Sequence, residues 1–324
     1  MRIIALFGPT GVGKTNVAVA VAQMLRARGE DPVAVSADAL QVYAGLETLT
    51  GAAGNAERGM LEHRLLSFVA IDETFSVGRY ARLAHAEIDG LLADGRRPIV
   101  VGGTGLYLRA ALTELDLRPP APKGAREFWM AELQRLGAPS LHATLAEHAP
   151  AVAERLDPND RQRIVRALEL LDLDGHPGEQ GASRQPEPPP VPAEGASQKT
   201  PPEPRGESQL WSEDLRRPTL LAGLTMEREA LYEAIERRVD GMVEAGARDE
   251  VLRAHAAGAS ETARKALGFQ ELMDGEIDAM KQRTRNYAKR QLTWMRKLAG
   301  VRRIDVSGRS ATEVAREILD CEPA

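Results

Sequence analysis

The feature that most constrains the fold is a glycine-rich segment between an apolar run and a helical pattern. Residues 2–7 are predicted to form a buried strand, and residues 14–27 are an alanine- and valine-rich helical pattern. Residues 8–15 lie between the strand and the helix and include the first two residues of the helix. They fit the consensus G-x-x-x-x-G-K-[ST], and they have the strand-to-helix context that this motif requires. In such a loop, backbone N–H groups and the helix N-terminus converge on phosphate oxygens. We therefore predict a phosphate site at Gly8, Pro9, Thr10, Gly11, Val12, Gly13, Lys14 and Thr15, with Mg²⁺ as cofactor on the Thr15 hydroxyl.

Further strands and helices alternate along the chain. Strands are predicted at 32–36, 98–101 and 220–224, and helices at 77–93 and 105–112. Such alternation is typical of βαβ units around a parallel sheet. We therefore expect the α/β fold class, with a P-loop NTPase-like parallel sheet flanked by helices.

The chain has 324 residues, enough for about two domains at roughly 150 residues each. Residues 1–118 are expected to form the first part of the P-loop core. Residues 119–176 carry only helical patterns, at 126–136, 140–147 and 159–173, and so predict an inserted helical subdomain.

Residues 177–324 divide into two segments of different composition. Residues 177–207 hold nine prolines and four hydrophobic residues, too few to offset the entropy of ordering. We therefore predict a Pro-rich disordered loop over 177–212. Residues 213–324 are expected to return to the core and to end in basic helices, with Cys321 in a frayed tail. These helices are predicted at 227–243, 247–256, 262–274 and 276–299.

Charge is unevenly distributed. The net charge is −5, yet residues 281–303 carry nine basic side chains and no acidic one. A basic stripe on an acidic protein is typical of a phosphate-backbone contact, here through Arg285, Lys289 and Arg290. The single cysteine excludes an internal disulfide, and apolar runs are too short to span a membrane. We expect a cytoplasmic protein.

The acidic residue expected beside a nucleotide phosphate is missing from its usual place. The strand at 98–101 ends in Gly102-Gly103-Thr104-Gly105, with no acid. Asp38 instead follows the strand at 32–36, where a side chain faces the ligand crevice of an open α/β sheet. Its carboxylate could hold Mg²⁺ through water or act as a general base. The alternative is a local helix cap.

Seven collinear blocks of this sequence resemble bacterial tRNA dimethylallyltransferases. They span almost the whole chain except 177–210. The blocks are the glycine-rich segment at 8–15, Ser-x-Asp-x-x-Gln-x-Tyr at 36–43, Val-Gly-Gly-Thr-Gly-Leu-Tyr at 101–107, Asp157-Pro158-Asn159-Asp160 with the block from Arg163 to Glu169, Leu224-Thr225-Met226-Glu227-Arg228, Leu267-Gly268-Phe269, and the run from Tyr287 to Trp294.

The resemblance implies transfer of a dimethylallyl group from dimethylallyl diphosphate to N6 of the adenine 3′ of the tRNA anticodon. The glycine-rich loop would then hold a diphosphate that departs, which explains the missing acid after the third strand. Catalytic roles are implied for Asp38 as the base, Thr104 beside the target adenine and Arg228 on the diphosphate.

The resemblance also implies the tRNA contacts and a monomer. The helical subdomain would clamp the anticodon stem-loop. The implied contacts are Asp38, Ala39, Leu40, Gln41, Thr104, Arg126, Gln162, Arg163, Ile164, Val165 and Arg166. Two alternatives stay open: a P-loop kinase that uses ATP on a small metabolite or nucleoside, and a nucleotide-regulated RNA-binding switch without catalysis.

Overall fold

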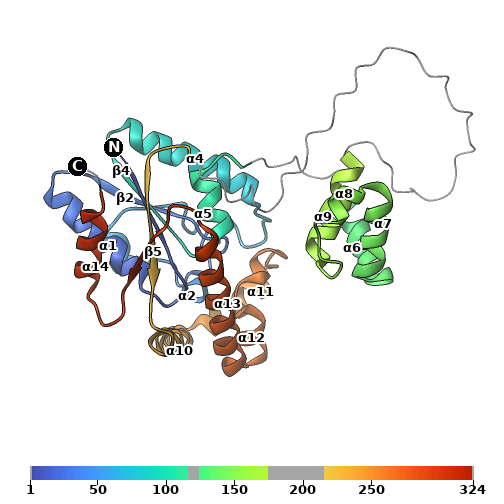
Figure 1. Cartoon of the computed structure of the whole chain (residues 1–324). Helices are drawn as coiled ribbons and strands as arrows, with labels where there is room; N and C mark the ends of the chain where they lie inside the picture. Colours follow the sequence, from blue (N-terminus) through green and yellow to red (C-terminus); the bar gives the residue numbers. More distant parts are fainter. Residues whose placement is uncertain (1, 116–123, 174–214, 323–324) are drawn as a thin grey trace, which may run out of the picture. The chain divides into compact units, whose positions relative to one another are not determined.

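A computed structural model describes residues 2–115, 124–173 and 215–322 (Figure 1). These residues fall into two compact units. The first contains residues 2–115 and 215–322, and the second contains residues 124–173. The predicted disordered loop at 177–212 lies outside the described residues. Each unit is described by itself below.

The first unit is built on one six-stranded sheet in which all paired strands are parallel. The strand order is β3-β2-β4-β1-β5-β6. Helices cover the sheet (Figure 1), so the predicted fold class is confirmed. The strands are β1 (Ile3–Phe7), β2 (Pro32–Ser36), β3 (His63–Arg64), β4 (Arg97–Gly102), β5 (Thr219–Thr225) and β6 (Arg302–Asp305).

The central strand β1 is buried on both faces because its side chains alternate between two cores. Ile3, Ala5 and Phe7 pack with α4 (Val77–Ala93) and α5 (Gly105–Leu112). Ile4 and Leu6 pack with α1 (Lys14–Ala27) and α14 (Ala311–Asp320). This burial explains why the strand is apolar at every position, as parallel strands covered on both faces are.

The other elements of the first unit include several that the sequence patterns miss. The predicted helix at 262–274 is wrong as one element, because Ala266 is extended (φ −54°, ψ 132°) and divides it. The elements that the sequence patterns do not predict are α2 (Glu47–Thr50), α3 (Asn55–Met60), β3, β6 and α14. The remaining elements of this unit are α10 (Arg228–Glu244), α11 (Ala247–Ala256), the 3₁₀ helix η2 (Ala263–Lys265), α12 (Phe269–Asp274) and α13 (Ile277–Lys297).

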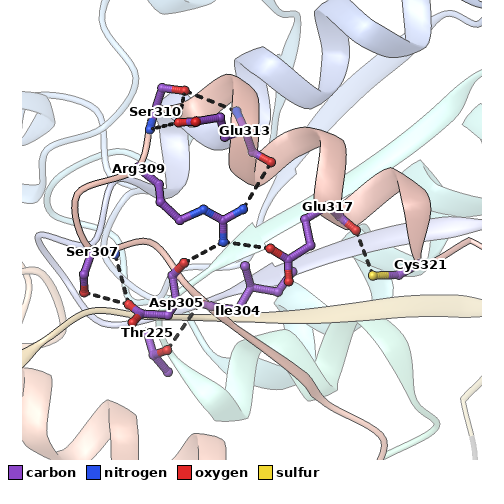
Figure 2. A network of polar contacts seen from close by, with 9 residues as sticks. All are labelled: Thr225, Ile304, Asp305, Ser307, Arg309, Ser310, Glu313, Glu317 and Cys321. Atoms are coloured by element: carbon purple, nitrogen blue, oxygen red, sulfur yellow. Dashed lines mark hydrogen bonds and ion pairs between the residues drawn. The ribbon is translucent and has the colours of Figure 1, made fainter.

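The C-terminus is not a frayed tail. Strand β6 pairs with β5, and α14 packs against α1. Figure 2 shows how polar contacts hold this end of the chain: the Arg309 guanidinium donates to the Asp305 carbonyl and pairs with the Glu317 carboxylate at 2.7 Å. The Cys321 thiol donates to the Glu317 carbonyl. Cys321 therefore ends an ordered helix.

Replacing Ile318 with alanine is expected to lower the free energy of unfolding by about 2–5 kcal/mol. Ile318 is fully buried among side chains that include those of α1, so the change leaves a cavity beneath the helix that follows the glycine-rich loop. Urea denaturation measures the loss. Arg316→Ala, at an exposed position of the same helix, is the control and should change stability by less than about 0.5 kcal/mol. Equal stability of both variants would return α14 to the status of a frayed tail.

The second unit is a small helical bundle with its own core. It contains α6 (Ala125–Leu136), α7 (Ala138–His148), α8 (Pro150–Ala153) and α9 (Arg161–Leu173). Trp129, Leu141 and Leu145 pack with Ile164 and Leu168. The three helical patterns predicted for the insertion are confirmed as α6, α7 and α9.

Candidate active site

The site lies where the loops after β1, β2 and β4 meet at the carboxyl edge of the sheet. Strand β4 lies between β1 and β2, so its loop is in contact with the other two. A Cβ atom at Gly102 would lie 2.3 Å from the carbonyl oxygen of Ala37, a separation that only glycine permits. Ligands of open α/β sheets bind at this edge.

The glycine-rich loop carries its lysine in a fixed position. Residues 8–13 connect β1 to α1, and α1 begins at Lys14. The Lys14 ammonium donates to the carbonyl oxygens of Gly8 at 2.9 Å and Pro9 at 3.0 Å. The charge is thereby held over the loop that would cradle an anion.

Burial in this site lowers the pKa of Lys14 to about 8. Desolvation of the ammonium is the largest cause, and the nearby Arg238 guanidinium adds to it, whereas the Asp38 carboxylate opposes the shift. The charges of Lys14, Arg238 and Asp38 therefore interact with one another in this site. A site with surplus buried positive charge is suited to a polyanionic ligand.

Asp38 caps the turn after β2 and also lies at the cavity. One carboxylate oxygen accepts hydrogen bonds from the backbone N–H of Leu40 at 3.0 Å and of Gln41 at 3.4 Å. These bonds stabilise the turn after β2 and orient the side chain, which lines the cavity. The carboxylate that caps this turn therefore also lies at the cavity.

Helix α13 contributes a second set of polar groups. The Tyr287 hydroxyl lies 3.1 Å from the Thr104 hydroxyl. Burial, with a contribution from the negative charge of Asp38, raises the pKa of Tyr287 to about 12. Tyr287 is therefore a neutral hydrogen-bond partner for Thr104 at physiological pH.

Lys14, Asp38, Thr104, Arg238 and Tyr287 line one cavity of about 300 Å³. This volume is at the lower end of the range for ligand pockets, roughly 300–1,000 Å³. The lining residues that the sequence predicted are Thr10, Lys14, Thr15, Asp38, Ala39, Leu40, Gln41, Thr104 and Arg290.

Other lining residues were missed. Tyr287 and Gln291 lie in the block from Tyr287 to Trp294, but nothing in the sequence predicts a role in the site for either. Arg238 lies in the middle of α10, where the surrounding sequence carries no recognisable motif. The Arg238 guanidinium donates to the Thr50 carbonyl at 3.2 Å. The apolar lining includes Leu49, Val239, Met242, Leu267 and Met280, which come from α2, α10, α13 and the segment before α12.

Comparison with known proteins identifies the family. Residues 41–298 match the IPP transferase family. The chain belongs to this family. A tRNA dimethylallyltransferase of Kineococcus radiotolerans is 35% identical, over 99% of this chain and 96% of that protein. One of Symbiobacterium thermophilum is 36% identical, over 98% and 93%. The crystal structure of a full-length tRNA isopentenylpyrophosphate transferase from Bacillus halodurans has a TM-score of 0.65 at 30% identity, covering 98% of this chain and 96% of that one. The resemblance inferred from the sequence is thus confirmed.

Arg228, a catalytic candidate by family likeness, is not brought to the cavity. It lies at the exposed start of α10 and donates from Nε to the Tyr232 hydroxyl at 3.3 Å. Lys289 lies over the same Tyr232 ring, 5.9 Å from its centroid. Among the residues that the structure describes, neither lines the cavity, whereas Arg238 does. Arg285 also lies outside that lining and pairs with Glu236 at 2.6 Å.

The tRNA contacts predicted in the second unit divide into two groups. The side chains of Ile164 and Val165 are buried in the core of the helical bundle, so an RNA contact at these two positions would have to be made by the backbone. Arg126 and Arg166 flank the buried Glu169 at 3.1 and 3.0 Å. Arg126, Gln162 and Arg163 are exposed and Arg166 is half-buried, and Arg163 pairs with Asp160 at 3.2 Å.

The described residues offer few ligands for the predicted Mg²⁺. Within residues 2–115, 124–173 and 215–322, no cluster of three or more His, Cys, Asp or Glu side chains could hold a metal. The Thr15 hydroxyl and the Asp38 carboxylate both line the cavity. They are hard oxygen donors of the kind that Mg²⁺ prefers, with phosphate oxygens completing its shell.

Among the described residues, no helix is both long enough and apolar enough to cross a bilayer.

Proposed function

We propose that this protein transfers the dimethylallyl group of dimethylallyl diphosphate to N6 of the adenine 3′ of the anticodon in tRNA, releasing diphosphate. One observation carries the proposal. A single cavity brings the P-loop lysine, a carboxylate and a cluster of apolar side chains together. Membership of the IPP transferase family supports the same reaction.

The diphosphate is assigned to the glycine-rich loop. Negative charge develops on it as the allylic carbon–oxygen bond breaks. Lys14 and the backbone N–H groups at the start of α1 are placed to stabilise that charge, and Arg238 supplies a second cation. Donors fixed before the reaction stabilise a transition state most effectively. Mg²⁺ on the Thr15 hydroxyl would add positive charge beside the leaving group.

The proton is assigned to Asp38. The adenine amine is a weak nucleophile because its lone pair is delocalised into the ring. As N6 forms its bond to the allylic carbon, its proton becomes acidic and passes to the Asp38 carboxylate. Thr104, fixed by Tyr287, lies at the same edge of the sheet and would contact the base. The adenine must leave the stack of the anticodon loop to reach this position.

The prenyl tail is assigned to the apolar lining. The side chains of Leu49, Val239, Met242, Leu267 and Met280 offer a surface for a branched five-carbon group. The flexible methionines adapt to such a shape. The anticodon stem-loop itself is assigned to Arg290 and its basic neighbours on α13, and to the exposed arginines of the second unit. The monomeric state and the cytoplasmic location stay predictions.

Prenyl transfer to an isolated stem-loop tests this function. The purified protein, Mg²⁺ and dimethylallyl diphosphate labelled in the prenyl group are mixed with an unmodified anticodon stem-loop. We expect label in the RNA and an equal amount of free diphosphate. A stem-loop with guanosine in place of the target adenosine is the control and should stay unlabelled. Hydrolysis of ATP without prenyl transfer would favour the kinase or switch alternative instead.

Diphosphate affinity is expected to fall above pH 8. The pKa of Lys14 in the free protein is about 8, and the bound anion favours the ammonium form. Binding therefore takes up a proton at higher pH, and the dissociation constant should rise by about tenfold per pH unit well above that pKa. Calorimetry at pH 7 and pH 9 measures the change. Lys14→Arg, whose guanidinium stays charged, controls for titration of diphosphate itself. An equal pH dependence in both proteins would contradict the role of Lys14.

A further inference from the structure

A buried glutamine of α13 joins two of the loops that form the cavity. Gln291 is only 4% exposed. Its amide oxygen accepts from the backbone N–H of Thr10 at 2.8 Å, and its amide nitrogen donates to the carbonyl of Gly103 at 2.7 Å. The amide oxygen is therefore bonded to the phosphate-binding loop, and the amide nitrogen is bonded to the loop after β4.

The fit between these groups is close. A Cβ atom at position 103 would lie 2.4 Å from Nε2 of Gln291 and 3.3 Å from the Lys14 ammonium nitrogen. A side chain at position 103 would therefore displace the Gln291 amide from its present position. An amide donates from its nitrogen and accepts at its oxygen, so it can bond to both loops without adding charge beside Lys14.

The bond to Thr10 also bears on how the loop meets its ligand. A phosphate-binding loop acts through backbone N–H groups that point in a common direction. Because Gln291 accepts from Thr10, part of the loop is held in place by the protein. One turn earlier on α13, Tyr287 contacts Thr104, so the same helix face fixes both loops.

We propose that Gln291 is a positioning residue that sets the shape of the phosphate-binding loop for the diphosphate of the prenyl donor. The inference rests on the proposed function, because it takes the occupant of the loop to be that diphosphate. Gln291 acts through the Thr10 and Gly103 backbones. Fixing the loop before the ligand arrives removes part of the ordering cost of binding.

Gln291→Met tests the proposal, because it keeps the length and volume of the side chain and removes both hydrogen bonds. Three quantities are compared with the wild type: amide hydrogen exchange of residues 8–15, the dissociation constant of inorganic diphosphate with Mg²⁺, and the kinetic constants of prenyl transfer. The control is Gln23→Met, at an exposed position of α1, the helix that the loop opens.

We expect exchange in residues 8–15 to become at least fivefold faster in Gln291→Met, and the diphosphate dissociation constant to rise about tenfold. The KM for dimethylallyl diphosphate should rise with it, whereas the affinity for the stem-loop stays within twofold. Gln291→Glu should be weaker still, since a carboxylate would face the Gly103 carbonyl. Where Gln291→Met does not fold, Gln291→Asn, whose shorter side chain cannot reach both loops, gives the same measurements.

Exchange and diphosphate affinity within twofold of the wild type in Gln291→Met would overturn the proposal, as would equal changes in Gln23→Met. Failure of the proposed function looks different. The wild type would then neither bind diphosphate nor transfer the prenyl group. Faster exchange in Gln291→Met would still show that the glutamine holds the loop, and unchanged exchange would refute that as well.

Discussion

Replacing Asp38 with asparagine is expected to lower the rate of prenyl transfer by a factor of about 10² to 10⁴, the usual contribution of a positioned general base. The asparagine oxygen can still accept from the Leu40 and Gln41 N–H groups, so the turn after β2 keeps its shape. What is lost is a group that can take the N6 proton. Single-turnover transfer with saturating dimethylallyl diphosphate measures the effect on the chemical step.

The matched control for this variant is Asp305→Asn. Asp305 also accepts from a backbone N–H two residues ahead, that of Ser307 at 3.0 Å, but it belongs to the C-terminal network in Figure 2. The Asp305→Asn variant should transfer the prenyl group at the wild-type rate. The affinity of Asp38→Asn for the stem-loop should stay within a few-fold of the wild type. A transfer rate in Asp38→Asn within threefold of the wild type would remove Asp38 from the role of base.

Replacing Lys14 with alanine is expected to lower kcat/KM for dimethylallyl diphosphate by about 10² to 10³, as removal of one fixed donor from a charge-stabilising site does. The Lys14 ammonium is held over the loop by Gly8 and Pro9, so its attraction for the departing diphosphate needs no rearrangement. Steady-state kinetics with varied donor and saturating stem-loop measures the loss.

Two further measurements separate this effect from a loss of folding. The unfolding midpoint and the stem-loop affinity of Lys14→Ala should match those of the wild type, because α1 is held by its buried face. Lys14→Arg restores the charge and should recover part of the activity. Donor kinetics in Lys14→Ala within threefold of the wild type would place the diphosphate elsewhere in the protein.

Local patterns were sufficient for elements whose own residues carry the signal. β1, α1, β2 and α4 are continuous apolar or amphipathic runs, and the structure has them within a residue of the predicted bounds. β6 could not be found this way. It reads Arg-Arg-Ile-Asp with one buried residue, and it is a strand because its backbone pairs with β5. Its partner is about 80 residues away in the chain, which a local pattern does not contain.

The same distinction applies to the site. The sequence alone was sufficient to predict the glycine-rich loop, because its glycine spacing and its strand-to-helix context lie within residues 2–27. It also determined the place of Asp38, since a residue that follows a parallel strand lies at the carboxyl edge of the sheet. Only the tertiary structure decided that Arg238 lines the cavity while Arg228 does not, and that Gln291 bonds to Thr10 across 281 positions. Such contacts depend on how α10 and α13 pack against the sheet, and helix packing is set by complementary surfaces that no short stretch of sequence describes.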